Sequence, residues 1–388
     1  MISLLARIFI KDRKNYSDRK VRESYGVLCG GFGIFLNLLL FAAKYFFGIL
    51  ACSVSMRADA LNNLSDAASS IVQILGFKLS SKKPDPEHPF GHGRLEYIAG
   101  LIISFFIIHM GVELIKDSIG KIINPQQSQI NIVSVIIMCA AILVKFYMYS
   151  YNHFIAKKIK SVSMEATAKD SFSDMISTSV VIISMILSRF TSFPVDAAGG
   201  IIVSLFILKT GIETAKDTIL PLLGTSPSKE LAENVEKELL LHEPVIGMHD
   251  LVVHDYGPGR MMISLHAEVP GNKNIFELHD VIDNAENDIA KKFNCHVIIH
   301  MDPVDTKNKR LDIFKKIIKE ECLRIDEQMN FHDVRIVPGK THTNLIFDVV
   351  KPFCCKMSDE ELKLKLNQAI HARESDIYCV ITIDQPFA

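Results

Sequence analysis

The sequence has no excess of charge of either sign: 43 Lys and Arg residues are balanced by 44 Asp and Glu residues, for a net charge of −1. General nucleic-acid binding needs a basic surface, so this balance argues against it. The 8 cysteines form no CxxC pair, and we expect free thiols of a reducing compartment. HExxH, GxSxG and P-loop motifs are also missing, so nothing supports an enzyme such as an intramembrane metal-dependent hydrolase.

Apolar residues, in contrast, are abundant: they make up 48% of the chain, and the mean hydropathy is +0.22. A positive value over this length is unusual for a soluble protein and indicates membrane spans. Almost all long apolar runs lie in the first 220 or so residues. We predict six spanning helices, at roughly 26–52, 54–79, 96–117, 129–152, 162–187 and 196–216. The second and fifth are the weakest by hydropathy, because they contain acids and amides.

Lys and Arg are distributed unevenly over the short loops. They gather in the N-terminal arm and in the loops after the second and fourth spans, whereas the other side has Lys121 and Arg189. This asymmetry predicts that both termini are cytoplasmic. We expect an integral protein of a bacterial cytoplasmic (inner) membrane. The start, MISLLARIFIKDRK, has no small-residue cleavage site, so it predicts an interfacial helix rather than a signal peptide.

The second and fifth predicted spans resemble each other. ADALNNLSDAASS (58–70) aligns with ATAKDSFSDMISTS (166–179), and Asp66 matches Asp174. Three helices separate the copies, so the two copies cross in opposite senses, as in the inverted repeats whose interface forms the binding site of many transporters. Chance similarity between two helices rich in small residues is the alternative.

Three acids lie near the middle of these two spans: Asp66, Asp170 and Asp174. Each ionised carboxylate at the bilayer centre costs about 2.5–3.5 kcal/mol. No basic residue in the spans looks placed to neutralise them, except Lys169. We therefore expect these acids to bind a cation, take up protons or line water. A polar helix contact between protonated acids is the competing interpretation.

The spacing of these residues favours a cation site. Asn62 and Asp66 are four residues apart, as are Asp170 and Asp174, so each pair shares a helix face. Four oxygen donors without imidazole or thiolate suit Mn(II), Mg(II) or Fe(II) better than Zn(II). Mg(II) keeps its water, so a dry site favours Mn(II). Neighbouring carboxylates in a low dielectric also bind protons when no metal is present, which suggests proton-for-metal exchange by alternating access.

The charged remainder of the chain contains a second repeat. MHDLVVHDYGPGRMMISLHAEVP (248–270) resembles FHDVRIVPGKTHTNLIFDVVKP (331–352), and CHVIIHMDP (295–303) resembles YCVITIDQP (378–386). Each copy reads helix, strand, turn, strand, helix, strand, with alternating apolar residues in the strands. We predict two small α+β domains that meet near residues 305–309.

Together these motifs resemble the cation diffusion facilitator family. The resemblance rests on Asn62-x-x-x-Asp66, Asp170-x-x-x-Asp174, FGHGRLEY (90–97) and IIHMDP (298–303), and covers about residues 20–305. It implies a homodimer of six-helix protomers with ferredoxin-like cytoplasmic domains, which exports divalent metal in exchange for protons. The Asn-Asp-Asp-Asp quartet resembles the manganese-exporting branch. Zinc, iron or cobalt export is the alternative, and a membrane metal sensor without flux is a remote one.

The expected architecture is therefore a six-helix transmembrane domain joined to a duplicated α+β ferredoxin-like domain. Its boundaries are predicted as a basic arm at 1–22, the transmembrane domain at 23–217, the first cytoplasmic domain at 218–305 and the second at 306–388. The second departs from the family pattern; extending the dimer interface and binding a partner are both open roles. Expected partners are the metal ion, protons, membrane lipid and a second copy of the chain, with no nucleic acid and no cofactor.

The resemblance also points to two secondary metal sites. Asp85, His88 and His92 match loop positions that bind metal in some relatives, and a solvated loop is the alternative. A larger set matches the positions that line a regulatory metal cluster in zinc-type relatives: His249, His266, His279, His300 and Asp302. The alternatives are that these histidines lie on the protein surface without binding metal, or that His266 and His300 simply pack. The second copy keeps His332 and Asp384 but has Asp348 and Thr382 in place of His266 and His300, so we predict that it has lost this site.

Overall fold

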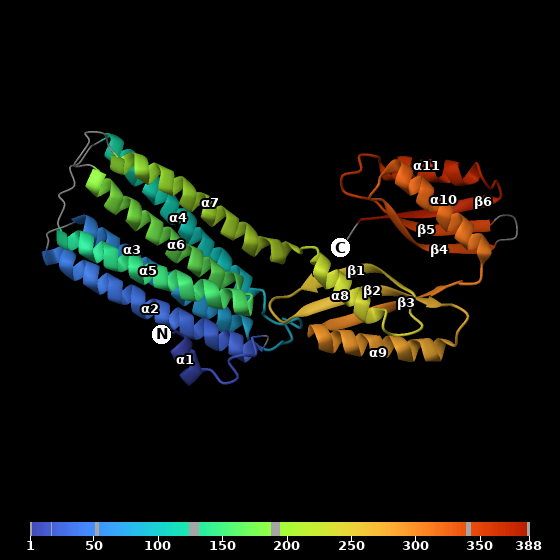
Figure 1. Ribbon diagram of the computed structural model, residues 1–388, viewed down its shortest axis with the longest axis horizontal. Helices are drawn as coiled ribbons and strands as arrows, with labels where there is room; N and C mark the ends of the chain where they lie inside the picture. Colours follow the sequence, from blue (N-terminus) through green and yellow to red (C-terminus); the bar gives the residue numbers. More distant parts are fainter. Residues whose placement is uncertain are drawn as a thin grey trace. The chain divides into compact units, whose positions relative to one another are not determined.

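The computed structural model describes residues 2–16, 18–50, 54–123, 132–187, 195–338 and 343–385. The chain divides into two compact units. One comprises residues 1–225 together with 255–260, and the other comprises 226–254 together with 261–388. Figure 1 shows helices alone in the first unit and both helices and sheets in the second. The boundaries predicted at residues 22, 217 and 305 stay predictions.

The first unit is a bundle of long helices (Figure 1). A short helix, α1 (Ile2–Phe9), precedes α2 (Arg19–Leu50), α3 (Val54–Ser80), α4 (Leu95–Ile123), α5 (Ile132–Ile159), α6 (Val162–Leu187) and α7 (Val195–Leu223). The described part of each predicted span thus falls on one long helix, while residues 51–52 of the first span and 129–131 of the fourth lie outside the described residues. Segments of α2, α4, α5 and α7 are long and apolar enough to cross a membrane. Within the described residues, the same measure does not select α3 and α6, so their crossing stays a prediction.

Glycines allow helices of the bundle to approach closely. A Cβ atom added at Gly111 of α4 would lie 2.9 Å from the Leu208 side chain of α7, and one added at Gly211 of α7 would lie 2.7 Å from the Ile108 side chain of α4. Small residues at such contacts let helix backbones pack closely where no water drives association. Large side chains such as Phe105, Leu143 and Ile202 are exposed on the outer surface, as expected for helices that face lipid.

The second unit contains two repeats of the same element order. The first comprises α8 (Lys229–Leu239), β1 (Gly247–Asp255), β2 (Met261–Pro270), α9 (Ile275–Phe293) and β3 (His296–Val304). The second comprises α10 (Lys309–Ile325), β4 (Asn330–Pro338), β5 (Thr343–Val350), α11 (Asp359–His371) and β6 (Ile377–Asp384). The strand orders are β1-β2-β3 and β4-β5-β6, and the last two strands of each sheet are parallel. The predicted order of elements is confirmed, and the ferredoxin-like assignment stays a prediction.

Each repeat has its own hydrophobic core between one sheet and two helices. In the first, Leu265 and Ala267 of β2 pack with Leu239 of α8 and Ile282 of α9. In the second, Leu345 and Phe347 of β5 have the corresponding places among residues of α10 and α11. Caps define where these helices begin, since Ser228, Asn274, Asn308 and Ser358 each accept a hydrogen bond from a backbone N–H of the first turn.

The turn after β1, residues 255–260, belongs to the helical unit. Arg94 donates two hydrogen bonds to the Asp255 carbonyl, and the Tyr97 hydroxyl donates to the Asp255 carboxylate at 2.6 Å. Gly257 has a φ of +107°, and a Cβ atom there would lie 2.2 Å from the Gly93 backbone. The FGHG segment of the α3–α4 loop therefore packs directly against the YGPG turn.

Candidate functional site

Asp66, Lys145 and Asp174 meet inside the helical bundle. The Lys145 ammonium of α5 donates hydrogen bonds to Asp66 Oδ2 of α3 at 2.7 Å and to Asp174 Oδ2 of α6 at 2.5 Å. All three side chains are at least nine-tenths buried. Burial of three charges is costly unless they are paired, and this geometry pairs them.

The expectation that only Lys169 could neutralise the acids is therefore wrong. Lys169 instead contacts Asp217 at 3.0 Å, where both side chains are partly exposed. Lys145 could have been noticed in the sequence, because it is a lone charge within the apolar run AAILVKFYM. An ionisable residue inside a span is by default a candidate functional residue. What the sequence could not give was which acids it contacts.

Asp170 lies one helical turn before Asp174 and is also buried. It accepts a hydrogen bond from Ser69 of α3 and interacts electrostatically with Asp66, Asp174 and Lys145. The structure thus brings the three predicted carboxylates to one region between α3 and α6, around one ammonium group.

Asn62, the fourth predicted ligand, is placed differently. It is exposed, whereas its neighbour Asn63 is 2% exposed. The buried stripe of α3 contains Asn63, Asp66, Ser70 and Gln73, at spacings of three and four residues. Asn62 therefore lies outside this stripe, and its role as a ligand stays a prediction.

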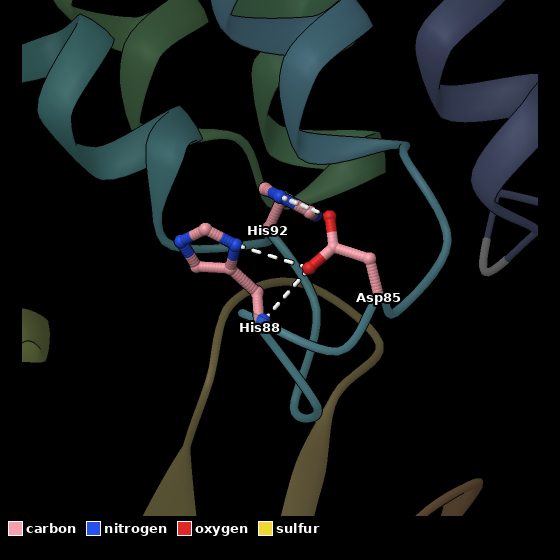
Figure 2. A group of neighbouring side chains, drawn as sticks. All are labelled: Asp85, His88 and His92. Carbon is pink, nitrogen blue, oxygen red and sulfur yellow. Dashed lines mark hydrogen bonds and ion pairs between the residues drawn. The ribbon is translucent and has the colours of Figure 1, made fainter.

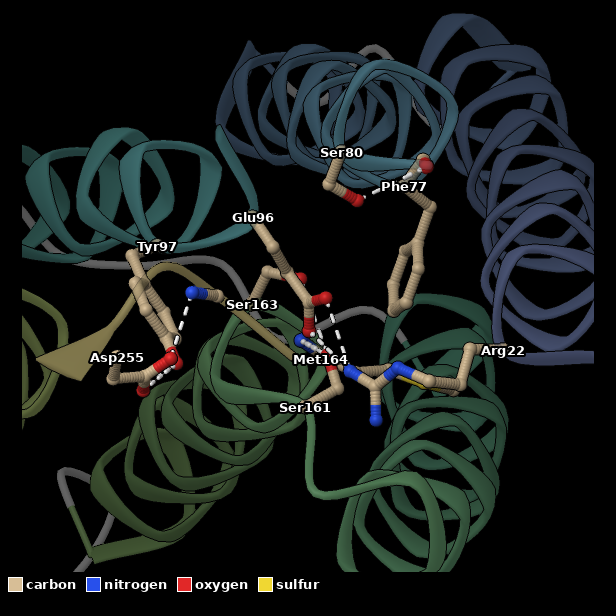
Figure 3. A network of polar contacts seen from close by, with 10 residues as sticks. Arg22, Phe77, Ser80, Glu96, Tyr97, Ser161, Ser163, Met164 and Asp255 are labelled. Carbon is tan, nitrogen blue, oxygen red and sulfur yellow. Dashed lines mark hydrogen bonds and ion pairs between the residues drawn. The ribbon is translucent and has the colours of Figure 1, made fainter. Parts of the chain in front are cut away.

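A second buried ion pair joins α2 to α4. Arg22 Nη2 donates to both carboxylate oxygens of Glu96, at 3.2 and 3.0 Å, and Glu96 also accepts a hydrogen bond from Ser161 (Figure 3). The two side chains are 9% and 2% exposed. Because Ser161 directly precedes α6, this network ties three helices together, and no pattern in the sequence indicated it.

The predicted loop residues Asp85, His88 and His92 come together between α3 and α4 (Figure 2). His88 Nδ1 lies 3.1 Å from Asp85 Oδ1, and His92 Nε2 lies 3.3 Å from Asp85 Oδ2. Desolvation works to raise the pKa of Asp85, but hydrogen bonds from His88 and the two nearby imidazoles lower it overall. Each residue offers one ligand atom, and these atoms all lie within 4.8 Å of one another. This arrangement can hold a metal ion.

The first cytoplasmic repeat gathers most of the predicted regulatory set. Asp302 Oδ2 lies 3.1 Å from His249 Nε2 and 2.8 Å from His266 Nδ1, while Asp302 Oδ1 lies 3.3 Å from His300 Nε2. His249, His266 and Asp302 can present ligand atoms within 4.8 Å of one another. His279 lies apart from this group, on the exposed surface of α9, where it contacts Asp283 at 3.4 Å.

Comparisons with known proteins identify two domains in the chain. Residues 32–223 match the cation efflux transmembrane domain, and residues 227–304 match the cytoplasmic domain of cation efflux proteins. Both matches end before the second repeat of the α+β unit. Residues 305–388 therefore lie outside these two domain descriptions.

Three relatives illustrate the similarity. An uncharacterized transporter of Methanocaldococcus jannaschii is 35% identical over 270 residues, which cover 69% of this chain and 95% of the relative. The manganese efflux system protein MneS of Bacillus subtilis is 27% identical, over 76% of this chain and all of the relative. The cation-efflux pump FieF of Cronobacter sakazakii is 27% identical, over 68% of this chain and 88% of the relative. The chain therefore belongs to the cation diffusion facilitator family, whose members are cation-efflux transporters and not enzymes.

Proposed function

We propose that this protein exports a divalent metal ion from the cytoplasm in exchange for protons, with Mn(II) as its preferred substrate. The observation that carries the proposal is the convergence of Asp66, Asp170 and Asp174 between α3 and α6, the two helices of the predicted inverted repeat. Burying carboxylates within a bundle of membrane helices is energetically costly, so such groups are expected to serve a function. Here they provide a binding site near the middle of the spans.

The donor chemistry supports Mn(II). The buried group offers carboxylate and hydroxyl oxygens, with no imidazole or thiolate in the quartet, and such hard donors suit Mn(II) better than Zn(II). The similarity to the manganese efflux protein MneS points in the same direction. Zinc, iron and cobalt are the alternative substrates.

The charge of the group supports exchange. Three ionised carboxylates and one ammonium carry a formal net charge of −2, which one divalent ion or two protons would neutralise. A metal ion that binds Asp66 and Asp174 must first displace the Lys145 ammonium from the same oxygens. We propose that Lys145 stabilises the metal-free site and moves aside when metal enters.

The proposed assembly is a homodimer in the cytoplasmic membrane, with six crossings per protomer and both termini on the cytoplasmic side. The excess of Lys and Arg on one set of loops supports this orientation, and the match to the cytoplasmic domain of cation efflux proteins supports dimerisation. We further propose that the loop group (Asp85, His88, His92) and the cytoplasmic group (His249, His266, Asp302) bind metal as secondary sites, with His300 and His279 as additional candidate ligands.

Metal flux into proteoliposomes tests the transport function. Wild-type protein should take up Mn(II) when a proton gradient is imposed, and Zn(II), Fe(II), Co(II) and Cd(II) should compete less well. Asp174→Asn should reduce uptake to background, whereas Asp217→Asn, which alters a partly exposed acid of α7, should not. Uptake that ignores the proton gradient would contradict exchange, and full activity of Asp174→Asn would contradict the site.

A further inference from the structure

His249 and His332 stack against each other across the two cytoplasmic repeats. They hold the same position in the two copies, within MHD (248–250) and FHD (331–333). Their ring centroids are 4.6 Å apart with an interplanar angle of 24°, and each side chain is 9% exposed. The repeats meet here through β3 and β4.

Three of the four ring nitrogens of His249 and His332 have no hydrogen-bond partner among the described residues. Both ring nitrogens of His332 and the Nδ1 atom of His249 are buried without one among the described residues. A buried polar atom without a hydrogen bond carries a free-energy cost, so native proteins rarely retain several side by side. A cation bound by these nitrogens would remove that cost.

Carboxylates complete a set of ligands around His332. Its Nε2 atom lies 3.3 Å from Asp250 Oδ1 of the first repeat and 3.6 Å from Asp384 Oδ2 of its own repeat. His249, Asp250 and His332 each offer an atom within 4.8 Å of the others. Two ligands that are each about 2.0–2.1 Å from a tetrahedral ion lie roughly 3.3 Å apart, which is the separation of His332 Nε2 and Asp250 Oδ1.

The two copies differ in a way that leaves Asp250 available. Asp250 and Asp333 are equivalent and share the same left-handed backbone, with φ values of 52° and 50°. Asp333 is paired with Arg335 at 2.8 Å, whereas the residue equivalent to Arg335 in the first copy is Val252. Among the described residues, Asp250 contacts His332 and has no arginine partner like the one at Asp333.

The strand registers show why the second repeat cannot rebuild the first repeat's own group. His266 faces His300 across β2 and β3, and the equivalent pair across β5 and β6 is Asp348 and Thr382. The second repeat thus lacks two imidazoles but keeps His332 and Asp384. A repeat that has lost its own site but retains these two residues at the boundary can serve the site of its neighbour.

We propose that His249, Asp250 and His332, with Asp384 beside them, form a divalent-metal site that joins the two cytoplasmic repeats of one chain. Two imidazoles with one or two carboxylates suit borderline ions such as Zn(II) and Co(II), in contrast to the oxygen-only group within the membrane. A cleft of about 560 Å³ lined by His249, Asp250 and His332 gives an ion access from solvent. His249 also belongs to the group with His266 and Asp302, so occupation of the two groups is linked.

Co(II) titration of the purified full-length protein tests the site, because tetrahedral Co(II) bound to nitrogen absorbs visible light more strongly than Co(II) bound only by oxygens. His332→Ala should lose one bound Co(II), or bind it at least about 10-fold more weakly, with a reduced visible band. His371→Ala is the matched control, since it removes another histidine of the second repeat that lies outside these groups. It should behave as wild type.

Two further variants keep the test decisive. A lower melting temperature of His332→Ala than of wild type in EDTA would show that the substitution itself destabilises the fold. In that case Asp250→Asn is used as the test variant, and it should show the same loss of Co(II). Asp174→Asn should lose an ion without losing the visible band, which separates this site from the transport site. Unchanged Co(II) stoichiometry and affinity in both His332→Ala and Asp250→Asn would overturn the proposal.

Discussion

Lys145 donates a 2.5 Å hydrogen bond to Asp174 and a 2.7 Å hydrogen bond to Asp66, and so links helices α3, α5 and α6 through one ammonium group. The acids on their own would repel one another in a low dielectric. The ammonium group makes the metal-free arrangement stable, but it also occupies the oxygens that a metal ion needs. Stability without metal and affinity for metal are therefore opposed at this residue.

Replacing Lys145 should separate these two effects. Lys145→Met leaves two carboxylates without a partner, and breaking a buried pair costs about 3–5 kcal/mol, so the thermal midpoint in detergent without metal should fall. Mn(II) should bind more tightly, because no ammonium competes for Asp66 and Asp174. The thermal midpoint without metal measures the loss of stability, and equilibrium binding measures the change in affinity for Mn(II). Lys169→Met is the control, since its partner Asp217 is more than half exposed. Weaker Mn(II) binding in Lys145→Met would contradict competition.

Asn62 offers a test of metal selectivity. Asn62→His adds a nitrogen donor one turn before Asp66, and borderline ions favour imidazole, so the ratio of Zn(II) to Mn(II) uptake should rise. Competitive uptake into proteoliposomes measures this ratio, with Asn62→Asp as the variant that keeps an oxygen donor. Asn62 is exposed in the structure, so an unchanged ratio would remove it from the ligand set.

The capping box of α11 predicts a pH dependence in the second repeat. Hydrogen bonds from the Ser358 backbone and side chain hold the pKa of Glu361 below its usual value. A carboxylate whose pKa is lowered by folding stabilises the folded state above its unfolded pKa of about 4.3, and this stabilisation is lost as pH falls through the folded value.

Glu361→Ala should therefore speed amide hydrogen exchange in the first turn of α11, relative to wild type, at pH 7. The difference should shrink near pH 3. Glu360→Ala changes an acid of the same turn outside the capping box and should have a smaller effect. An effect of Glu361→Ala that is equal at both pH values would exclude the ionised cap as its cause.

Deleting residues 306–388 should leave measurable Mn(II) transport. The first repeat has a complete core of its own, formed by α8, α9 and its three strands, so its folding does not require the second repeat. The deletion should, however, remove the Co(II) site that depends on His332. Flux and Co(II) binding of the truncated protein measure the two outcomes. Loss of all flux in a truncated protein that inserts and folds normally would show that the second repeat is essential for transport.

The sequence by itself determined the features that depend on local pattern. Apolar runs give the long helices, and alternating residues with polar caps give the elements of both cytoplasmic repeats, since each is set by neighbours a few positions apart. The same local spacing placed Asp170 and Asp174 on one face of α6. The loop group of Asp85, His88 and His92 could also be predicted from the sequence, because its members lie within eight residues of one another.

Only the tertiary structure decided which distant side chains meet. Lys145 contacts Asp66 across 79 residues of sequence and Asp174 across 29, and no periodicity within α5 specifies either contact. Asn63 rather than Asn62 is buried, because the direction of the buried face depends on how α3 packs against its neighbours. His332 meets His249 because the two repeats pack together, and spacing within one repeat carries no information about the surface of the other. Local pattern determines which residues lie on the same face of a helix or strand, but only packing determines what that face contacts.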